Sequence, residues 1–195
     1  MKKIVLTLAL GLATANAYAT TPPAPLWQTG QIQCYDASNN PVACSVAEKG
    51  QDGAVQAGAA WDIATRFEVN GDVVTDTLTG LQWQQDPSVN NSGNTLRWKT
   101  ALNTCNDLDQ GGQTDWRLPN RTELNSLVDL AAANPAGALN DNGFVSVNER
   151  ASVYWSSSTY ALSTGFAWVV DFGDGSVYDV GKRDDYRAWC VRSGL

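Results

Sequence analysis

The stretch Asp115–Leu130 constrains the fold more than any other part of the chain, because it combines a rigid turn, a helix start and an apolar helix face. Pro119 fixes its own φ and drives the preceding residue towards extended geometry. Asn120 is a good N-cap residue, and Glu123 follows at the spacing of a capping box. The next apolar residues recur at helical spacing: Leu124, Leu127 and Val128. We predict a helix that begins after Asn120 and stops at Asn134-Pro135.

The N-terminus has the three parts of a secretory signal peptide. Lys2 and Lys3 supply positive charge, Ile4–Leu12 is a short apolar run, and Ala17-Tyr18-Ala19 is a cleavage site of the A-x-A type. The apolar run is too short to span a bilayer, and no later run is long and apolar enough to do so. We expect cleavage of residues 1–19 and export to the periplasm, the cell surface or the medium, without a membrane span.

The charge of the mature chain argues against one class of partner. Cleavage removes Lys2 and Lys3 and leaves 11 basic and 20 acidic residues, a net charge of −9. Non-specific nucleic-acid binding depends on neutralising phosphates with excess positive charge. We therefore expect no nucleic-acid partner.

The cysteine count predicts two disulfides, because an exported chain with an even number of cysteines is usually fully paired. Of three possible pairings we favour Cys34–Cys44, whose short loop contains a turn signal at Asn39-Asn40-Pro41, together with Cys105–Cys190. The second bond would tie the first predicted helix to the last predicted strand. The chain has no histidine and no Cys-x-x-Cys spacing, so we expect neither a metal site nor a cofactor.

The chain divides after the signal peptide into a lead-in, residues 20–65, and a main domain, residues 66–195. The lead-in starts with Thr-Thr-Pro-Pro-Ala-Pro, an extended linker, and continues rich in Gly, Gln, Asn and Ala. Its few apolar residues include Trp27 and Trp61. We expect an irregular, disulfide-pinned segment that lies on the main domain.

The main domain is predicted to contain strands, then two helices, then more strands. A hairpin is expected from Phe67 to Thr75 across Asn70-Gly71, followed by a short strand at Leu81–Trp83. A Thr95 cap should precede a helix whose buried face is Trp98, Ala101, Leu102, Cys105 and Leu108.

After the second helix, residues 135–143 are predicted to be a loop. The later strands are expected at Val153–Ser158, Phe166–Phe172, Ser176–Val180 and Arg187–Arg192. Alternation would place one set of side chains on a core face: Phe166, Trp168, Val170 and Phe172. The fold class is therefore α+β, with two helices packed on short antiparallel strands and stapled by disulfides.

Some side chains have a predicted structural role. Trp98, Trp116 and Trp168 are expected in the core, whereas the pattern leaves Trp155 and Trp189 undetermined. Arg117 is expected to pair with a nearby carboxylate, because an unpaired buried arginine is costly; the candidate partners are Asp115 and Asp129.

Seven spaced motifs carry a family resemblance. They are Asn70-Gly71-Asp72, Asp76-x-Leu78-Thr79-Gly80-Leu81-x-Trp83, Trp98-x-x-Ala101-Leu102-x-x-Cys105, Asp115-Trp116-Arg117-Leu118-Pro119-Asn120-Arg121-x-Glu123-Leu124, Tyr154-Trp155-Ser156-Ser157-Ser158, Ala167-Trp168-x-Val170 and Cys190-Val191-Arg192. Together they resemble the DUF1566 family, also called the Lcl C-terminal domain, over about residues 66–193. The resemblance implies a C-type-lectin-like or formylglycine-generating-enzyme-like fold, and it supports the Cys105–Cys190 pairing.

The resemblance also implies an exported binding or adhesion module. The best-known family representative is a bacterial surface adhesin domain that engages sulfated glycans, so glycan binding is the implied activity. The chain departs from the related folds in several ways. It lacks the Glu-Pro-Asn, Gln-Pro-Asp and Trp-Asn-Asp calcium-and-sugar motifs of C-type lectins, the catalytic cysteine pair of formylglycine-generating enzymes, and a collagen-like stalk.

The candidate ligand site is the densest positive cluster, near the C-terminus. Arginine beside exposed aromatic rings suits recognition of sulfate or sugar through bidentate hydrogen bonds and stacking. The candidate ligand-binding residues are Tyr178, Lys182, Arg183, Tyr186, Arg187 and Trp189. Aspartates interleave with this cluster, so neutral surface ion pairs are the competing interpretation.

The sequence gives weaker support for catalysis or for metal binding. Ser156-Ser157-Ser158 has no histidine base, and no glutamate lies in an acid/base motif for glycoside hydrolysis. Asp171, Asp174 and Asp179 flank a predicted hairpin without the ligand register of an EF-hand. We expect a non-catalytic module for an extracellular glycan or a cell-surface protein. The alternatives are a secreted or periplasmic glycan hydrolase and a structural subunit of a surface assembly.

Overall fold

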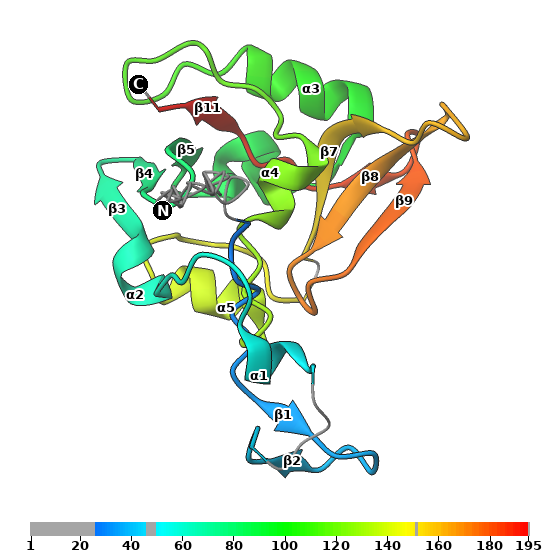
Figure 1. Cartoon of the computed structure of the whole chain (residues 1–195). Helices are drawn as coiled ribbons and strands as arrows, with labels where there is room; N and C mark the ends of the chain where they lie inside the picture. Colours follow the sequence, from blue (N-terminus) through cyan, green and yellow to red (C-terminus); the bar gives the residue numbers. More distant parts are fainter. Residues whose placement is uncertain (1–25, 46–49, 151, 195) are drawn as a thin grey trace, which may run out of the picture.

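The structure, a computed structural model, describes residues 26–45, 50–150 and 152–194. The expected signal peptide lies outside these residues. The described chain is α+β, with short helices and mainly antiparallel strands (Figure 1). The helices are α1 Asp52–Val55, α2 Ile63–Arg66, α3 Trp98–Asn106, α4 Arg121–Asn125 and α5 Pro135–Asn140, with a 3₁₀ segment at Pro87–Gly93.

The strands of the described residues form two main sheets and two small ribbons. The four-stranded sheet has the order β11-β5-β4-β3, with β3 Phe67–Asn70, β4 Val73–Asp76, β5 Leu81–Gln84 and β11 Val191–Ser193. The three-stranded sheet has the order β7-β8-β9, with β7 Val153–Thr159, β8 Phe166–Asp171 and β9 Val177–Gly181. The ribbons pair β1 Cys34–Tyr35 with β2 Pro41–Val42 and β6 Leu96–Arg97 with β10 Asp185–Tyr186.

The predicted hairpin is confirmed, with its loop displaced by one residue. Asn70 pairs with Val73, so the two loop residues are Gly71 and Asp72. Gly71 has a φ of 58°, a left-handed conformation that glycine adopts without a side-chain penalty.

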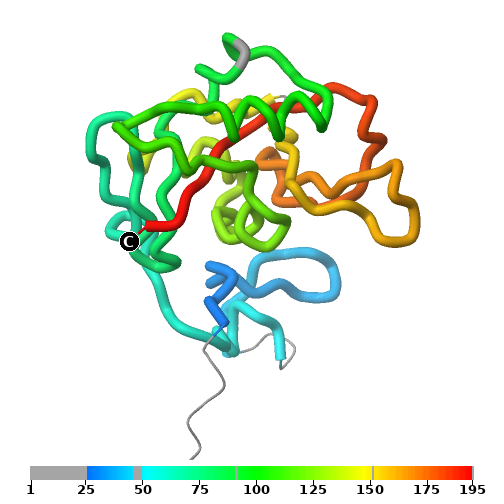
Figure 2. Tube along the Cα trace, turned by 90° about the horizontal axis from the view of Figure 1, so that it is seen from above, coloured from blue at the N-terminus to red at the C-terminus, as the bar shows by residue number. Residues whose placement is uncertain are grey.

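Both favoured disulfides are confirmed: Cys34–Cys44 in the lead-in, and Cys105–Cys190 in the main domain. The second joins α3 to the segment that enters β11. The two views agree that the C-terminal segment passes beside α3 (Figures 1 and 2). This bond therefore fastens the end of the chain across the first helix.

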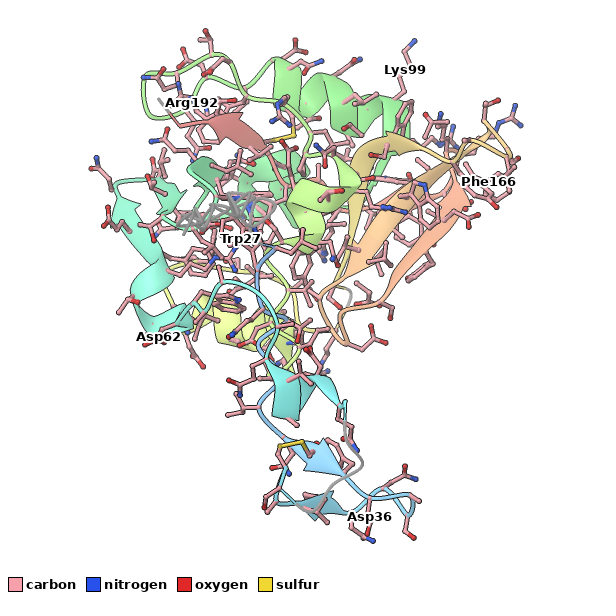
Figure 3. All side chains as sticks on the ribbon, in the orientation of Figure 1. Trp27, Asp36, Asp62, Lys99, Phe166 and Arg192 are labelled. Atoms are coloured by element: carbon pink, nitrogen blue, oxygen red, sulfur yellow. A yellow bond between two sulfur atoms is a disulfide. The ribbon has the colours of Figure 1, made fainter. Side chains whose placement is uncertain are left out.

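Two buried clusters lie on opposite faces of the three-stranded sheet. Val170 and Phe172 belong to a cluster that includes the four-stranded sheet and α5, whereas Ala167 and Val169 belong to a cluster that includes α3. The prediction of one buried face for β8 is therefore wrong, because both faces are covered. Phe166 is 40% exposed and lies at the outer end of the sheet (Figure 3).

The capping box at the start of α4 is confirmed. The Asn120 side chain accepts from Glu123 N at 2.9 Å, and Glu123 Oε2 accepts from Asn120 N at 2.8 Å. The predicted length is wrong, because α4 ends at Asn125. Beyond Asn125 the bonds tighten to i→i+3, since Leu127 N donates to Leu124 O at 3.3 Å and Val128 N to Asn125 O at 3.1 Å. The carbonyl of Ser126 accepts a hydrogen bond from Arg66 Nη2 at 2.9 Å. Leu127 is buried beyond the helix end.

Asn134-Pro135 starts a helix rather than ending one, so the predicted loop over residues 135–143 is partly wrong. Asn134 Oδ1 accepts from Gly137 N at 3.1 Å, and Pro135 occupies the first helical turn of α5. Proline suits that position because its missing N–H would have no helical partner there. The expected Thr95 cap of α3 is also wrong: Arg97 is the N-cap residue, because Leu96 and Arg97 pair with β10.

The partners expected for Arg117 are wrong. Its Nη1 and Nη2 donate to the two carboxylate oxygens of Glu123, both at 2.7 Å. Asp115 instead accepts from Arg192 Nε at 2.6 Å. The arginine side chain thus reaches forward to the third residue of α4, where it also holds the capping carboxylate in place.

Candidate ligand-binding cleft

The residues predicted as a C-terminal ligand site do not converge on one concavity. Lys182 Nζ lies 3.9 Å from the centroid of the Trp98 ring and donates to Thr159 Oγ1 at 2.8 Å. Tyr186 packs edge-on against Trp155, and Arg183 is exposed in the turn between β9 and β10. Tyr178 is partly exposed on the edge strand β9, where burial raises the pKa of its hydroxyl.

Arg187 and Trp189 diverge from this surface. Arg187 Nη1 donates to Gly93 O at 2.5 Å and lines an open hollow of about 570 Å³ together with Arg150. Trp189 is fully buried, and its Nε1 donates to Gln84 O at 2.9 Å. Because its indole is inside the core, Trp189 is removed from the candidate ligand-binding set.

A better-formed cleft lies where the lead-in meets the main domain. Its volume is about 390 Å³. The apolar part of its lining is Trp27, Trp61, Leu78, Val128, Leu130 and Val177. The polar side chains are Gln28, Thr29, Arg66, Asn125 and Ser126. We call this site the lead-in cleft. Its size and its mixture of apolar surface with a few polar groups are typical of small-ligand sites.

The lead-in touches the main domain near the cleft, while β1 and β2 project away from the body (Figure 1). Leu130 N donates to Thr29 O at 3.0 Å. Gly30 has a φ of 89°, and a Cβ at this position would collide with Asp129 Oδ1. Trp61 Nε1 donates to Gln28 O at 2.7 Å, which ties the two ends of the lead-in together.

Arg66 forms the floor of this junction. Its Nε and Nη2 donate to the two oxygens of Asp76 at 2.8 and 2.6 Å, and the carbon of its guanidinium lies 5.0 Å from the Trp61 ring centroid. Arg66 is the one ionisable side chain in the cleft lining among the described residues, and Asp76 neutralises it. The lining therefore carries no unpaired charge.

Most polar groups in the cleft already have protein partners. Gln28 Nε2 donates to Gln56 O at 2.6 Å, Thr29 Oγ1 donates to Asp52, and Ser126 Oγ donates to Glu123 O at 2.7 Å. Asn125 differs, since its exposed amide makes no side-chain hydrogen bond to the described residues. This amide offers both a donor and an acceptor to a ligand.

The open apolar surface of the cleft comes from both of its halves. Trp27 of the lead-in is 40% exposed, and Leu130 of the main domain is 44% exposed. Trp27 lies at the junction of the two parts (Figure 3). Trp27 and Asn125 line the same cleft, so the site provides a stacking surface and a hydrogen-bonding group.

The aspartate hairpin is explained by its own turn. Asp174 Oδ1 accepts from Ser176 N at 2.9 Å and from the Ser176 hydroxyl, and these bonds lower the pKa of Asp174. Asp171 Oδ1 accepts from Gly173 N at 2.8 Å. In the described ranges no three acidic or cysteine side chains are grouped so that they could hold a metal ion.

Sequence reasoning missed the cleft because its lining comes from segments about a hundred residues apart. The signal that pointed to it was the presence of Trp27 and Trp61 in a lead-in otherwise poor in large apolar residues. Periodicity identifies faces of single elements, and neither tryptophan lies in a periodic pattern.

Residues 72–192 match the model of the family described as the Lcl C-terminal domain. No curated protein matches the chain. The matched segment contains one side of the cleft, with Asn125 and Leu130, whereas Trp27, Trp61 and Arg66 lie outside it.

Proposed function

The chain belongs to the Lcl C-terminal domain family, and from this premise we propose that it is an exported, non-catalytic binding module with a lectin-like architecture. Its ligand is a glycan that occupies the lead-in cleft. The observation that carries the proposal is that one cleft without unpaired charge is lined by an exposed indole, Trp27, and by the Asn125 amide, which makes no side-chain hydrogen bond to the described residues.

The chemistry of a sugar ring suits this lining. A pyranose has apolar C–H faces and a rim of hydroxyl groups. An indole packs against the apolar face, and an amide donates to one hydroxyl while accepting from another. The cleft volume of about 390 Å³ accommodates one or a few sugar rings. Stacking and amide hydrogen bonds give recognition without a net charge in the cleft.

The absence of catalysis is part of the proposal. Glycoside hydrolysis needs a pair of carboxylates beside the scissile bond. The described residues that line the cleft include no carboxylate, and Arg66 is occupied by Asp76. A ligand bound there would meet no general acid or base.

Export is supported by the covalent structure. The two disulfides fit an oxidising compartment, so periplasmic, surface-bound and secreted forms are the proposed locations. None of the helices in the described part of the chain has the length and apolar content needed to cross a membrane.

Glycan binding in the lead-in cleft and glycan binding at the C-terminal cluster should differ in their dependence on salt concentration. Binding through lysine and arginine to sulfate weakens as salt screens the charges. Binding in the lead-in cleft should change little between low and moderate salt, because its lining has no unpaired charge. For a neutral glycan held in the lead-in cleft, salt dependence therefore separates the two locations.

The test is a glycan array with residues 20–195, covering neutral and sulfated glycans at low and moderate salt, with calcium or a chelator. Trp27→Ala is expected to weaken saturable binding about tenfold, the effect of losing ~1.4 kcal/mol of stacking. Arg183→Ala, an exposed residue outside the cleft, is the matched control and should leave binding unchanged.

Two outcomes would contradict the proposal. Loss of binding in Arg183→Ala with full binding in Trp27→Ala would return the site to the C-terminal surface. No binding by the folded, oxidised protein to any glycan would end the glycan hypothesis and favour a protein partner.

A further inference from the structure

A second cavity adjoins the lead-in cleft. It has a volume of about 240 Å³ and is lined by Arg121, Thr122, Asn125, Trp168 and Val177. Asn125 and Val177 also line the lead-in cleft, so the two cavities share a boundary. We call this second cavity the α4 groove, because its polar wall is the exposed side of α4.

The exposed side of α4 presents two unused polar groups. Arg121 and Asn125 are four residues apart, which places them on the same face of the helix. Their positions differ by about 6 Å along the helix axis, comparable with the length of one pyranose unit. Neither side chain makes a hydrogen bond or an ion pair to the described residues. Both remain available to a ligand that runs along the helix.

The far end of the groove contains a half-buried aromatic residue, Trp168. The guanidinium carbon of Arg121 lies 4.7 Å from the Trp168 ring centroid, and Tyr160 meets that ring edge-on at 5.3 Å. Arg121 N also donates to Ser158 Oγ at 3.0 Å, which fixes the start of α4 against β7. The cation–π contact positions the guanidinium without using its N–H groups.

We propose that the site binds a linear oligosaccharide whose chain continues from the lead-in cleft along α4 to Arg121 and Trp168. This inference rests on the proposed function and specifies its ligand as an extended chain rather than a single terminal sugar. One ring packs on Trp27, the next unit bonds to Asn125, and a further unit bonds to the Arg121 guanidinium beside Trp168. Shared lining by Asn125 and Val177 gives the chain a continuous path.

Calorimetry of residues 20–195 with two length series tests the proposal. The probes are neutral chito-oligosaccharides and sulfated dextran oligosaccharides, each from monosaccharide to hexasaccharide. Affinity is expected to rise about tenfold from the disaccharide to the tetrasaccharide and then to level off. The tenfold rise corresponds to ~1.4 kcal/mol of binding free energy from the added contacts. Arg121→Ala should remove that increment and leave disaccharide affinity unchanged.

Controls separate the groove from the cleft and from folding defects. Arg183→Ala and Asn103→Ala, both exposed and outside the two cavities, should preserve the full length dependence. Trp168→Ala is a second variant that removes a side chain at the same end of the α4 groove. Near-UV circular dichroism checks that this variant is folded. Trp27→Ala should weaken every member of the series equally.

Each outcome has a distinct meaning. Equal affinity for all chain lengths would overturn the groove proposal, and so would an Arg121→Ala protein that still gains the full affinity with chain length. In either case, binding that depends on Trp27 would still uphold the lead-in cleft. Failure of every probe to bind the wild-type protein would overturn both proposals.

Discussion

Arg66 and Asp76 form a two-point ion pair in the interior, with side chains 2% and 0% exposed. The same guanidinium reaches the carbonyl of Ser126, just past the end of α4. Asp76 also accepts from Leu78 N at 3.1 Å and from Thr79 Oγ1 at 2.7 Å. One buried pair therefore fastens the end of α2, the turn after β4 and the end of α4.

Removing one partner of this pair should be strongly destabilising. Asp76→Ala leaves the Arg66 charge buried and uncompensated, which typically costs roughly 3–5 kcal/mol of unfolding free energy. Urea denaturation followed by tryptophan fluorescence measures the change. Asp109→Ala, an exposed aspartate, is the control and should change stability by less than about 0.5 kcal/mol. A loss below about 1 kcal/mol in Asp76→Ala would contradict this account of the pair.

Gly30→Ala should loosen the lead-in without unfolding the main domain. Gly30 has a φ of 89°, and a methyl group there would collide with Asp129. Faster amide hydrogen exchange at Leu130, whose N–H donates to Thr29 O, is the expected signature. Gly71→Ala is a matched control, because Gly71 also has a positive φ but open space around it. Unchanged exchange at Leu130 in Gly30→Ala would show that the lead-in is held elsewhere.

Local signals in the sequence predicted much of the fold. The Asn120–Glu123 box, the β3–β4 hairpin and both disulfides depend on residues close in sequence or on cysteine chemistry. Errors arose where distant contacts decide the structure. Arg66, far away in sequence, takes the Ser126 carbonyl, and the sheet is covered on both faces around Val169 and Val170.

The candidate site was less predictable than the fold. The C-terminal cluster was identified from charge and aromatic content, but the structure places Lys182 over Trp98 and buries Trp189. Composition does not show which side of a short strand faces inward when both faces are covered. The lead-in cleft depends on contacts of Thr29 and Gly30 with Leu130 and Asp129, which no periodic pattern specifies.

The two disulfides should contribute unequally to stability. Cys105–Cys190 closes 85 residues, so replacing both cysteines with alanine should lower the unfolding free energy by about 4.5 kcal/mol. Cys34–Cys44 closes only 10 residues within the lead-in, and its removal should cost less, about 2–3 kcal/mol at most. Thermal denaturation of both alanine pairs measures the difference. A larger loss from the Cys34–Cys44 pair would contradict the assignment.

Acidification should remove the contribution of the Glu123 carboxylate. Burial alone would raise the pKa of Glu123, but hydrogen bonds from Arg117 and Asn120 outweigh it and hold the pKa below its usual 4.5. The unfolded chain therefore takes up the proton first, and the stabilisation, full above about pH 4.5, is lost as pH falls through the folded pKa.

A comparison of wild type with Glu123→Gln tests this pH dependence. The variant should be less stable at neutral pH by under about 1 kcal/mol, because Arg117 is partly solvent-exposed and screened. The difference in Tm should shrink as pH falls below 4.5 and through the folded-state pKa of Glu123. Glu68→Gln, an exposed glutamate on β3, controls for general acid effects. A difference that grows on acidification would reverse the assigned sign.

The division of the cleft between two segments has a consequence for protein engineering. Its indoles come from residues before 66, whereas Asn125 and Leu130 come from the segment matched to the family. The Cys105–Cys190 bond and both buried clusters lie entirely within the main domain. A library randomised around Trp27 would thus vary half of a binding surface on a constant scaffold, and grafting a different lead-in would exchange that half as a unit.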